Sequence, residues 1–394
     1  MTISYHTLGC KLNWAETDSL KKKLKNLGYS EAEFLTSENV AVIRACGVTE
    51  TATHSTLRAV RQAKSRNKVV IVCGCSDNIS EADLTTRDEK QILEYITNNF
   101  PADGTNTETE PLQRTRAFVK IQDGCAFQCA YCTIPHFRGR SISLPHQQII
   151  DEINNLISTN YREIVLTGVN VLLYNDANIK LSDLVKNILE QTKIERIRFG
   201  SIDPRLITAE FVKLFDNPRV LPHLHLSLQS GSNNILTAMN RHYTAEKYLT
   251  IIKEFRNQNP HFSFTTDVIV GFPGETETDH DASAALIEQA EFLKVHLFPF
   301  SARPNTVAAN LPDQISESVK KDRLKRLEKN ALEAKRNFAQ KFIGTKKFIL
   351  FEHSTESQFA SGYTPEYIRI RIPSNKDLAN QIREIQITKE NLAD

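Results

Sequence analysis

The feature that most constrains this chain is a loop of three cysteines, Cys125, Cys129 and Cys132, spaced C-x3-C-x2-C. Three thiolates at this spacing can hold three irons of a [4Fe-4S] cube and leave the fourth iron without a protein ligand. Electron carriers usually close that corner with a fourth cysteine. The spacing therefore predicts a cluster with one open iron, which suits chemistry on a bound small molecule.

Two other uses of these cysteines remain as alternatives, namely a zinc site and packing in an apolar core. Zinc sites favour paired C-x2-C knuckles with two further ligands nearby. Here His136 is the nearest additional candidate, and no second knuckle follows the loop. The sequence therefore favours the iron–sulfur interpretation.

A second cysteine set, Cys10, Cys46 and Cys75, lies in the first hundred residues. Each of the three is expected to come directly after a strand, next to a glycine. Because residues past the carboxyl ends of adjacent parallel strands converge in one crevice, the three thiols can meet around a second metal centre. Three buried cysteines are the alternative. Cys73 is interpreted as a packing residue of the third strand, or else as the ligand in place of Cys75.

The first hundred residues predict a small βαβαβ domain. Strands are expected at 3–8, 40–43 and 69–72, and helices at 15–27 and 51–65. Residues 69–72 are wholly apolar, as in a parallel strand that is covered on both faces. Residues 101–115 are polar and contain helix and strand breakers, so they are predicted to form a linker.

Residues 116–342 predict a partial (β/α)6 barrel followed by a trailing helix. Six strand-then-helix units can be counted, with strands expected at 118–121, 164–167, 197–200, 225–228, 264–269 and 292–298. Active sites of parallel barrels lie at the carboxyl ends of the strands, and the Cys125 loop follows the first strand. The trailing helix, expected at 316–342, has a basic face that is interpreted as solvated or, alternatively, as RNA-binding.

The tail, residues 343–394, changes its period to an alternation of apolar and polar side chains. Segments 348–351, 367–372 and 382–387 alternate as strands do. We expect a small carboxy-terminal β barrel. The fold class is therefore α/β, with an amino-terminal βαβαβ domain, a central partial barrel and a carboxy-terminal β domain.

Composition and charge limit the compartment and the partners. The net charge is +2 over 394 residues, so a nucleic-acid surface would have to be a local patch. The chain shows no secretory signal and no apolar run of membrane-spanning length. Seven cysteines in such a chain argue against a disulfide scaffold. We expect a cytoplasmic protein without a membrane partner.

Several motifs resemble the methylthiotransferases, a branch of the radical S-adenosylmethionine (radical SAM) enzymes. At the amino-terminal cysteines these are Thr7-Leu-Gly-Cys-Lys-Leu-Asn13, Cys46-Gly-Val-Thr49 and Gly74-Cys75. In the barrel they are 124–132 with Arg138-Gly-Arg-Ser141, His225-Leu-Ser-Leu-Gln-Ser-Gly-Ser232 and Asp267-Val-Ile-Val-Gly-Phe-Pro-Gly-Glu275. The tail resembles the RNA-binding TRAM domain. Taken together, the resemblance to the methylthiotransferases covers nearly the whole chain.

The resemblance implies two [4Fe-4S] clusters, S-adenosylmethionine (SAM) as cofactor, and radical methylthiolation of tRNA. Local features of the branch that acts on threonylcarbamoyl-adenosine are present, among them Asn240-Arg-His-Tyr-Thr-Ala245 and Phe298-Pro-Phe-Ser-Ala-Arg-Pro304. The expected reaction is methylthiolation at carbon 2 of N6-threonylcarbamoyladenosine at position 37, next to the anticodon. The alternatives are isopentenyl-adenosine in tRNA, an aspartate of a small-subunit ribosomal protein, and a non-catalytic iron–sulfur carrier.

The same resemblance implies site residues and partners. The cluster ligands are the two cysteine triplets, and the expected SAM contacts are Tyr131, Thr167, Gly168, Ser201, Gln229, Ser230 and Asp267. The expected RNA contacts are Tyr363, Tyr367, Arg369 and Arg371. The partners are the tRNA anticodon stem-loop and an electron donor such as flavodoxin or ferredoxin, while the sulfur source stays open.

Two positions depart from the pattern of the family. The usual Asn-Thr before the second cysteine is Arg44-Ala45 here, and the third cysteine is followed by Ser76-Asp77. Residues around the ligands tune a metal centre without holding it. These departures affect the expected surroundings of the amino-terminal cluster and leave its expected ligands unchanged.

Overall fold

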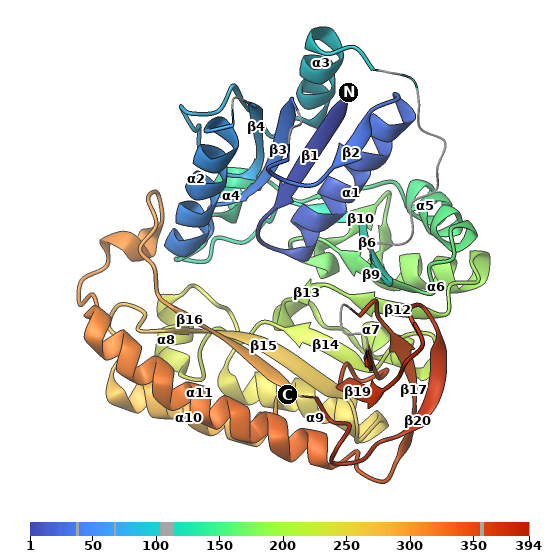
Figure 1. Cartoon of the computed structure of the whole chain (residues 1–394). Helices are drawn as coiled ribbons and strands as arrows, with labels where there is room; N and C mark the ends of the chain where they lie inside the picture. Colours follow the sequence, from blue (N-terminus) through green and yellow to red (C-terminus); the bar gives the residue numbers. More distant parts are fainter. Residues whose placement is uncertain (37–38, 67, 103, 105–113, 355–357, 394) are drawn as a thin grey trace.

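The computed structural model describes residues 1–36, 39–66, 68–102, 104, 114–354 and 358–393. It contains an amino-terminal sheet domain, a central half-open barrel and a small carboxy-terminal β domain (Figure 1). Most of the predicted linker, residues 103 and 105–113, lies outside the described residues.

The amino-terminal domain is a parallel sheet with strand order β2-β1-β3-β4-β5. Its strands are β1 (Thr2–Thr7), β2 (Ser30–Ala32), β3 (Val40–Cys46), β4 (Val69–Cys75) and β5 (Leu84–Thr85). The apolar sides of α1 (Lys11–Asn26) and α3 (Glu89–Asn99) pack on one face, and α2 (Glu50–Lys64) packs on the other. The three predicted strands and two predicted helices are confirmed, and two short edge strands and α3 are added to them.

The central domain contains six parallel strand positions, as predicted. The strands follow one another in two hydrogen-bonded groups, β6-β9-β12 and β13-β14-β15-β16. Only Gly200 separates β12 from β13, so these two form one kinked strand that joins the groups. The bounds are β6 (Arg116–Lys120), β9 (Glu163–Thr167), β12 (Arg196–Phe199), β13 (Ser201–Ile202), β14 (His223–Leu226), β15 (Ser263–Val270) and β16 (Lys294–Pro299).

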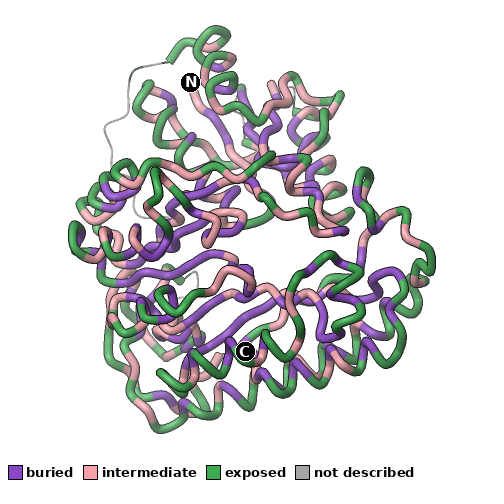
Figure 2. Tube along the Cα trace, turned by 180° about the vertical axis from the view of Figure 1, so that it is seen from behind, coloured by how far each residue is buried: buried purple, intermediate pink, exposed green. Residues whose placement is uncertain are grey.

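Helices cover the outside of the barrel strands and bury their apolar sides. They are α5 (His146–Ser158), α6 (Leu181–Gln191), α7 (Ala209–Lys213), α8 (Asn233–Ala238), α9 (Ala245–Gln258), α10 (Glu277–Ala290) and α11 (Glu317–Gln340). A large apolar core joins these helices, except α8, to the strands, and Ile235 of α8 belongs to a smaller apolar cluster. Figure 2 shows the buried strands enclosed by helices whose outer sides are exposed. None of the described helices has the length and hydropathy that a membrane-spanning helix needs.

Smaller elements surround the ends of the barrel strands. Two short antiparallel pairs are β7 (Gln122–Asp123) with β8 (Ile142–Ser143), and β10 (Asn175–Asp176) with β11 (Ile179–Lys180). The short helix α4 (Ile134–Arg138) follows the Cys125 loop. The 3-10 turns are η1 (Val171–Leu173), η2 (Pro204–Leu206), η3 (Leu214–Asp216) and η4 (Val307–Asn310).

The tail forms an antiparallel sheet with strand order β19-β18-β17-β20. Its strands are β17 (Lys346–Phe351), β18 (Phe359–Tyr363), β19 (Arg369–Pro373) and β20 (Ile382–Gln386). After β20 the chain returns to β19, where Ile370 pairs with Leu392, and so closes the sheet upon itself. The expected small β barrel is confirmed, although β18 was not predicted.

The basic face predicted for the trailing helix is only partly a surface. Lys320 and Arg323 of α11 are buried. The Lys320 ammonium donates to the Phe300 carbonyl at 3.0 Å, and the Arg323 guanidinium binds the Glu275 carboxylate at 2.9 Å. These two cations of the predicted basic face therefore attach α11 to the segments that follow β15 and β16.

Candidate functional site

The amino-terminal cysteines gather at one edge of the first sheet. Cys46 and Cys75 are register partners at the last positions of β3 and β4. Cys10 comes directly before α1, in the turn that follows β1. The sequence placed all three just past their strands. The structure corrects this for Cys46 and Cys75, which still belong to the ladder, while the predicted convergence holds.

Glycines allow these strand ends to approach one another closely. A Cβ atom added to Gly9 would lie 2.8 Å from the Cys46 Cβ and 3.0 Å from its sulfur. A Cβ on Gly47 would lie 2.7 Å from the Cys75 carbonyl oxygen. Gly74 has φ +97°, which favours glycine, and its added Cβ would meet the Ala45 carbonyl oxygen at 2.8 Å. Each glycine beside a cysteine is therefore required by the packing of the crevice.

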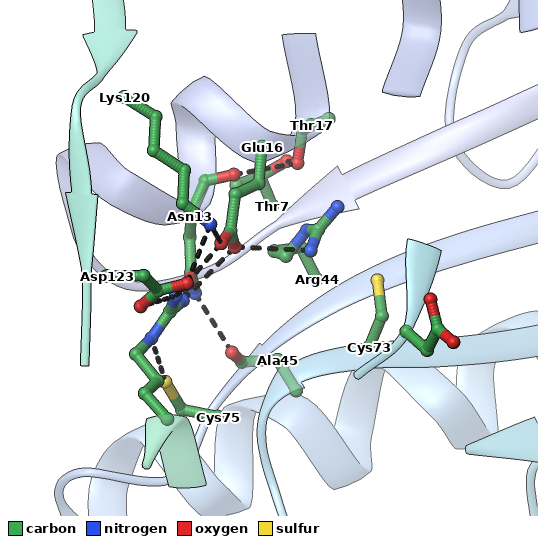
Figure 3. Close-up of polar contacts among 12 residues, drawn as sticks. Thr7, Asn13, Glu16, Thr17, Arg44, Ala45, Cys73, Cys75, Lys120 and Asp123 are labelled. Carbon is green, nitrogen blue, oxygen red and sulfur yellow. Dashed lines mark hydrogen bonds and ion pairs between the residues drawn. The ribbon is translucent and has the colours of Figure 1, made fainter. Parts of the chain in front are cut away.

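A charged network surrounds this crevice, and Arg138 lies at its centre. The Arg138 Nε donates to the Cys75 sulfur at 3.0 Å, and its Nη atoms bind Glu16, Asp123 and Asn13 at distances of 2.7–3.1 Å. In Figure 3 the side chains of Asn13, Glu16, Asp123 and Cys75 point toward one another. Lys120 also contacts Glu16, at 2.7 Å, and Asp123, at 2.6 Å.

Burial raises the pKa of two of the three thiols in this crevice, those of Cys46 and Cys75. Burial raises the pKa of Cys75 to about 11, and the Arg138 charge and hydrogen bond act against that rise. The pKa of Cys46 is also raised, again mainly by burial. A metal deprotonates a coordinating thiol outright. We infer that these cysteines become thiolates when they ligate a metal, with Arg138 ready to stabilise the charge.

The second cysteine set lies on the loop between β7 and α4. Gln122 is fully buried and organises the start of this loop. Its side-chain nitrogen donates to the Asp123 and Gly124 carbonyls and to the Ser141 hydroxyl, and its side-chain oxygen accepts from the Asn170 amide. The Cys125 amide donates to the Gly139 carbonyl at 3.1 Å, which closes the loop behind the cysteines.

Donors surround the sulfurs of this loop. The Phe127 amide lies 3.4 Å from the Cys125 sulfur, and the Arg241 Nη1 lies 3.5 Å from the Cys129 sulfur. Burial raises the pKa of Cys132 to about 12 and also raises that of Cys125. As in the first set, the protein supplies hydrogen bonds and positive charge to the cysteine sulfurs.

Both sets fit a [4Fe-4S] cluster by the chemistry of their donors. Each offers three cysteines and hydrogen-bond donors to sulfur, and charges and hydrogen bonds of this kind set cluster potentials. Among the described residues, no three His, Cys, Asp or Glu side chains are grouped to ligate one metal ion. A cube takes one thiolate on each of several irons, so its cysteines need not meet at one atom.

A second ion-pair network holds the Cys129 side of the site. The Asp203 carboxylate lies between two guanidiniums, with Arg205 bound through two nitrogens at 2.8–2.9 Å and Arg241 at 2.9 Å. The Arg205 guanidinium stacks 3.7 Å from the centre of the Phe127 ring, inside the cysteine loop. This network joins the end of β13 to the loop and to the turn before α9.

Most of the residues expected to contact SAM lie at or just past the carboxyl ends of the barrel strands. Thr167 is the last residue of β9 and Gly168 follows it, Ser201 begins β13, and Gln229 follows β14 in a left-handed conformation with φ 69°. Asp267 instead lies within β15, and Tyr131 lies on the cysteine loop. Tyr131 is half-buried beside an apolar cluster that includes Phe272 and Phe300. These positions agree with the prediction, and contact with SAM stays a prediction for each residue.

Two members of this set already have protein partners. The Ser230 hydroxyl is buried, accepts from the Ser232 amide at 3.2 Å and lies 3.5 Å from the Ser283 hydroxyl. The Asp267 carboxylate binds the His225 Nε2 at 3.1 Å. Burial alone would raise the pKa of Asp267, but His225 and His296 hold it below its usual value. Ser230 is thus part of the packing against α10, and Asp267 is hydrogen-bonded to His225 inside the barrel.

The four residues expected to bind RNA do not share one environment. Arg369 and Arg371 are exposed on the same side of β19, as predicted. Tyr367 instead stacks on His223 of the barrel at 4.6 Å and on Tyr363 at 4.7 Å between ring centres. The rings of the two tyrosines therefore lie at the interface with the barrel, and contact with RNA stays a prediction for both.

Cys73 differs from the other cysteines of its domain. It is 2% exposed and packs in the apolar core between the first sheet and helices α1 and α3. Its thiol lies 3.7 Å from the Ile43 carbonyl oxygen, and in Figure 3 it lies apart from the Cys75 network. The structure supports its interpretation as a packing residue.

Several residues of the site were not singled out from the sequence. They are Asn13, Glu16, Lys120, Gln122, Asp123, Arg138, Asp203, Arg205 and Arg241. Arg138 and Arg241 lie within motifs that the sequence does reveal, at Arg138–Ser141 and Asn240–Ala245. Asn13 likewise ends the motif Thr7–Asn13, so a motif was a usable signal for these three residues, whereas the others of the set lie outside the quoted motifs.

Comparison with known proteins agrees with this arrangement. Residues 119–287 match the Radical SAM superfamily, and residues 2–94 match the family described as Uncharacterized protein family UPF0004. Among solved structures, the radical S-adenosylmethionine methyltransferase TsrM from Kitasatospora setae aligns with a TM-score of 0.59. That alignment has 12% identity and covers 78% of this chain and 75% of the other, so it shows the fold alone.

Curated relatives match over nearly the full length. The threonylcarbamoyladenosine tRNA methylthiotransferase MtaB of Chlamydia pneumoniae is 38% identical over 391 residues, which cover 94% of this chain and 91% of the relative. The tRNA-2-methylthio-N(6)-dimethylallyladenosine synthase of Clostridium tetani is 30% identical, with 98% and 94% covered. On this similarity, the chain belongs to the radical SAM tRNA methylthiotransferase family.

Proposed function

We propose that this protein methylthiolates carbon 2 of N6-threonylcarbamoyladenosine at position 37 of tRNA, next to the anticodon. The main support is the pair of three-cysteine sites, linked through Arg138, in a chain 38% identical to a relative of that named activity. When bound, two [4Fe-4S] clusters and SAM supply the electron, the radical and the methylthio group for an adenine C–H bond that ordinary acid–base groups cannot attack.

In this proposal the side chains of the protein bind the two clusters and SAM and hold them in position. Cys10, Cys46 and Cys75 would hold one cluster, and Cys125, Cys129 and Cys132 the other. The carboxyl ends of the barrel strands, with Thr167, Ser201 and Gln229, would receive SAM beside the second cluster, as in other parallel barrels.

One basic side chain near the barrel favours a substrate with a threonylcarbamoyl group over a substrate with an apolar dimethylallyl group. Lys11 is half-buried and follows Cys10 at the start of α1. Burial lowers the pKa of Lys11, and its side chain interacts electrostatically with Tyr367, with Asp267 of β15 and with His296 of β16, so it lies near the barrel interior. The threonylcarbamoyl group carries a carboxylate, which a cation in a partly desolvated site binds well. A dimethylallyl group offers no such partner.

The remaining partners follow from the reaction. The exposed Arg369 and Arg371 would contact phosphates of the anticodon stem-loop. A reduced flavodoxin or ferredoxin would supply electrons, and the work would take place in the cytoplasm, where its tRNA substrate is found.

The proposal is tested by nucleoside mass spectrometry. Anaerobically reconstituted protein is incubated with SAM, reductant and sulfide, and with tRNA carrying either threonylcarbamoyl-adenosine or isopentenyl-adenosine. The expected product is 2-methylthio-N6-threonylcarbamoyladenosine. A chain that modifies only isopentenyl-adenosine would overturn the substrate assignment, and one that modifies neither would overturn the function.

Isopentenyl-adenosine is kept as the second substrate because relatives with that named activity also match. One of them, from Thermoanaerobacter, is 36% identical over 365 residues. The assay above therefore includes both tRNAs under identical conditions.

A further inference from the structure

Arg138 lies where the two cysteine sets meet. Helix α4 begins two positions after Cys132 and ends at Arg138. The same helix packs against β4, whose last residue is Cys75. The chain therefore carries one side chain directly from the loop of the second set to a sulfur of the first.

Every nitrogen of the Arg138 guanidinium has a partner. Nε donates to the Cys75 sulfur at 3.0 Å. Nη1 donates to Glu16 at 2.9 Å and to both oxygens of Asp123 at 3.0 and 3.1 Å, and Nη2 donates to Glu16 at 3.1 Å and Asn13 at 2.7 Å. The side chain is only 6% exposed. A planar fork with all nitrogens engaged fixes the positions of its partners in a way a flexible ammonium cannot.

These partners are the supports of both sites. The Asn13 side chain also donates to the Leu8 carbonyl at 2.6 Å and the Ala45 carbonyl at 2.9 Å, just before Cys10 and Cys46 in the chain. Asp123 lies two positions before Cys125. Arg138 is thus connected to all three strand ends of the first set and to both ends of the second loop.

The charges around Arg138 leave a place for one more anion. Arg138, Lys120 and Arg44 carry three positive charges, while Glu16 and Asp123 carry two negative ones. A metal-bound thiolate at Cys75 balances the set. Arg138, Arg44 and Glu16 are the buried members of this network, and an unbalanced buried charge is costly, so a negative sulfur beside Arg138 suits the network.

We propose that Arg138 is a positioning residue that holds Cys75 of the first cluster against the loop of the second, and that its guanidinium raises the reduction potential of the first cluster. A hydrogen bond and a positive charge at a ligand sulfur stabilise the more negative, reduced state of a cluster. The inference rests on the proposed function, because it takes Cys75 as a cluster ligand.

The test measures a potential, which a merely structural residue would not move. In the full chain with Cys125, Cys129 and Cys132 all replaced by alanine, only the first cluster is assembled, and its midpoint potential is measured by an EPR redox titration. Arg138→Gln should shift the potential to a more negative value, and Arg138→Lys should shift it less in the same direction. Arg114→Gln is the matched control, because it removes another ion pair between the two domains, to Asp18 at 2.9 Å, without touching a thiol.

The positioning role has its own readout in the chain with both cysteine sets. Pulsed EPR between the two reduced clusters should give a broader distance distribution in Arg138→Gln than in the parent or in Arg114→Gln. An unchanged potential and an unchanged distribution would overturn the inference. If Arg138→Gln does not fold, Arg138→Lys decides by the same criteria.

These outcomes separate the inference from the proposed function. A parent chain whose iron and sulfide amount to one cube, with Cys10, Cys46 and Cys75 unligated, would remove the two-cluster function itself. A parent chain with both clusters and an Arg138→Gln variant with parental potential and distances would remove only the role of Arg138.

Discussion

Glu163 and Arg198 form a buried ion pair across strands β9 and β12, with 2.7 Å between the Glu163 Oε1 and the Arg198 Nε. Arg196 pairs with the other oxygen at 2.7 Å. The free ends of both guanidiniums reach the carboxy-terminal β domain. Arg198 donates to the Thr364 and Pro365 carbonyls at 2.8 Å, and Arg196 to those of Phe348 and Tyr363 at 3.3 Å. One carboxylate thereby orients both arginines that attach this domain to the barrel.

Replacement of Glu163 by glutamine should loosen the carboxy-terminal domain. The change leaves two buried guanidiniums without a counter-charge, and a broken buried pair of this kind costs on the order of 3–5 kcal/mol. We expect a lower melting temperature and faster proteolytic release of residues after β17. Glu195→Gln is the control, because its pair with Arg162 is exposed and worth about 1 kcal/mol or less. Equal proteolysis in the two variants would refute the docking role.

The same carboxylate predicts a loss of stability in acid. Burial would raise the pKa of Glu163, but Arg198, Arg196 and Arg116 bring it down from its ordinary 4.5 to about 2. A lowered pKa means that the ionised form stabilises the fold above pH 4.5. This contribution is lost as the pH falls from 4.5 toward 2. Melting curves of the cluster-free chain over that range should fall less steeply with pH in Glu163→Gln than in the parent.

Cys129→Ala should abolish both SAM cleavage and tRNA modification, because it removes one of three ligands of the second cluster. The measurements are 5′-deoxyadenosine formation and nucleoside mass spectrometry. Cys73→Ala is the control, since that thiol is buried in the apolar core and lies apart from the network of Figure 3. Methylthiolated adenosine from the Cys129 variant would show that the radical site is wrongly assigned.

Lys11→Met should reduce activity on tRNA with threonylcarbamoyl-adenosine more than activity on tRNA with isopentenyl-adenosine. The lost charge lies near the barrel interior, where it is expected to bind the carboxylate of the threonylcarbamoyl group. We expect KM for tRNA with threonylcarbamoyl-adenosine to rise about tenfold or more, the equivalent of about 1.4 kcal/mol. Activity on isopentenyl-adenosine, if the parent has any, should change little. Equal losses on both tRNAs would contradict this role.

The cysteines were predictable from the sequence because their chemistry is encoded locally. Cys125, Cys129 and Cys132 lie within one loop, and the strand-end positions of Cys46 and Cys75 follow from apolar runs that end in glycine-bearing turns. Parallel strands bring their carboxyl ends to one edge whatever the helices between them. Because of this rule, cysteines that lie far apart in the sequence could be predicted to meet at one edge of the sheet.

The supports of the cysteines could not be predicted in the same way. Arg138 and Cys75 are 63 positions apart, and Arg138 and Glu16 are 122 apart, so no spacing relates them. The position of the tail tyrosines against the barrel could not be predicted for a related reason. An alternating pattern assigns residues to two faces of a strand but does not say which face meets another domain. Tyr367 moreover has φ 70° and precedes β19, so the alternation of the strand does not apply to it.

The exposed arginines of β19 provide the last prediction. Arg369 and Arg371 are exposed on the same side of the strand, whereas Tyr367 stacks on His223 at the barrel interface. We expect each arginine to neutralise one phosphate of the tRNA. The double change Arg369→Gln/Arg371→Gln should then weaken tRNA binding. It should also reduce the magnitude of the negative slope of log K against log salt by about 2. Tyr367→Phe is the control, since it keeps the stacking ring at the barrel and should leave the slope unchanged. Binding isotherms over a salt series measure both, and a parental slope in the double variant would exclude this face as the RNA contact.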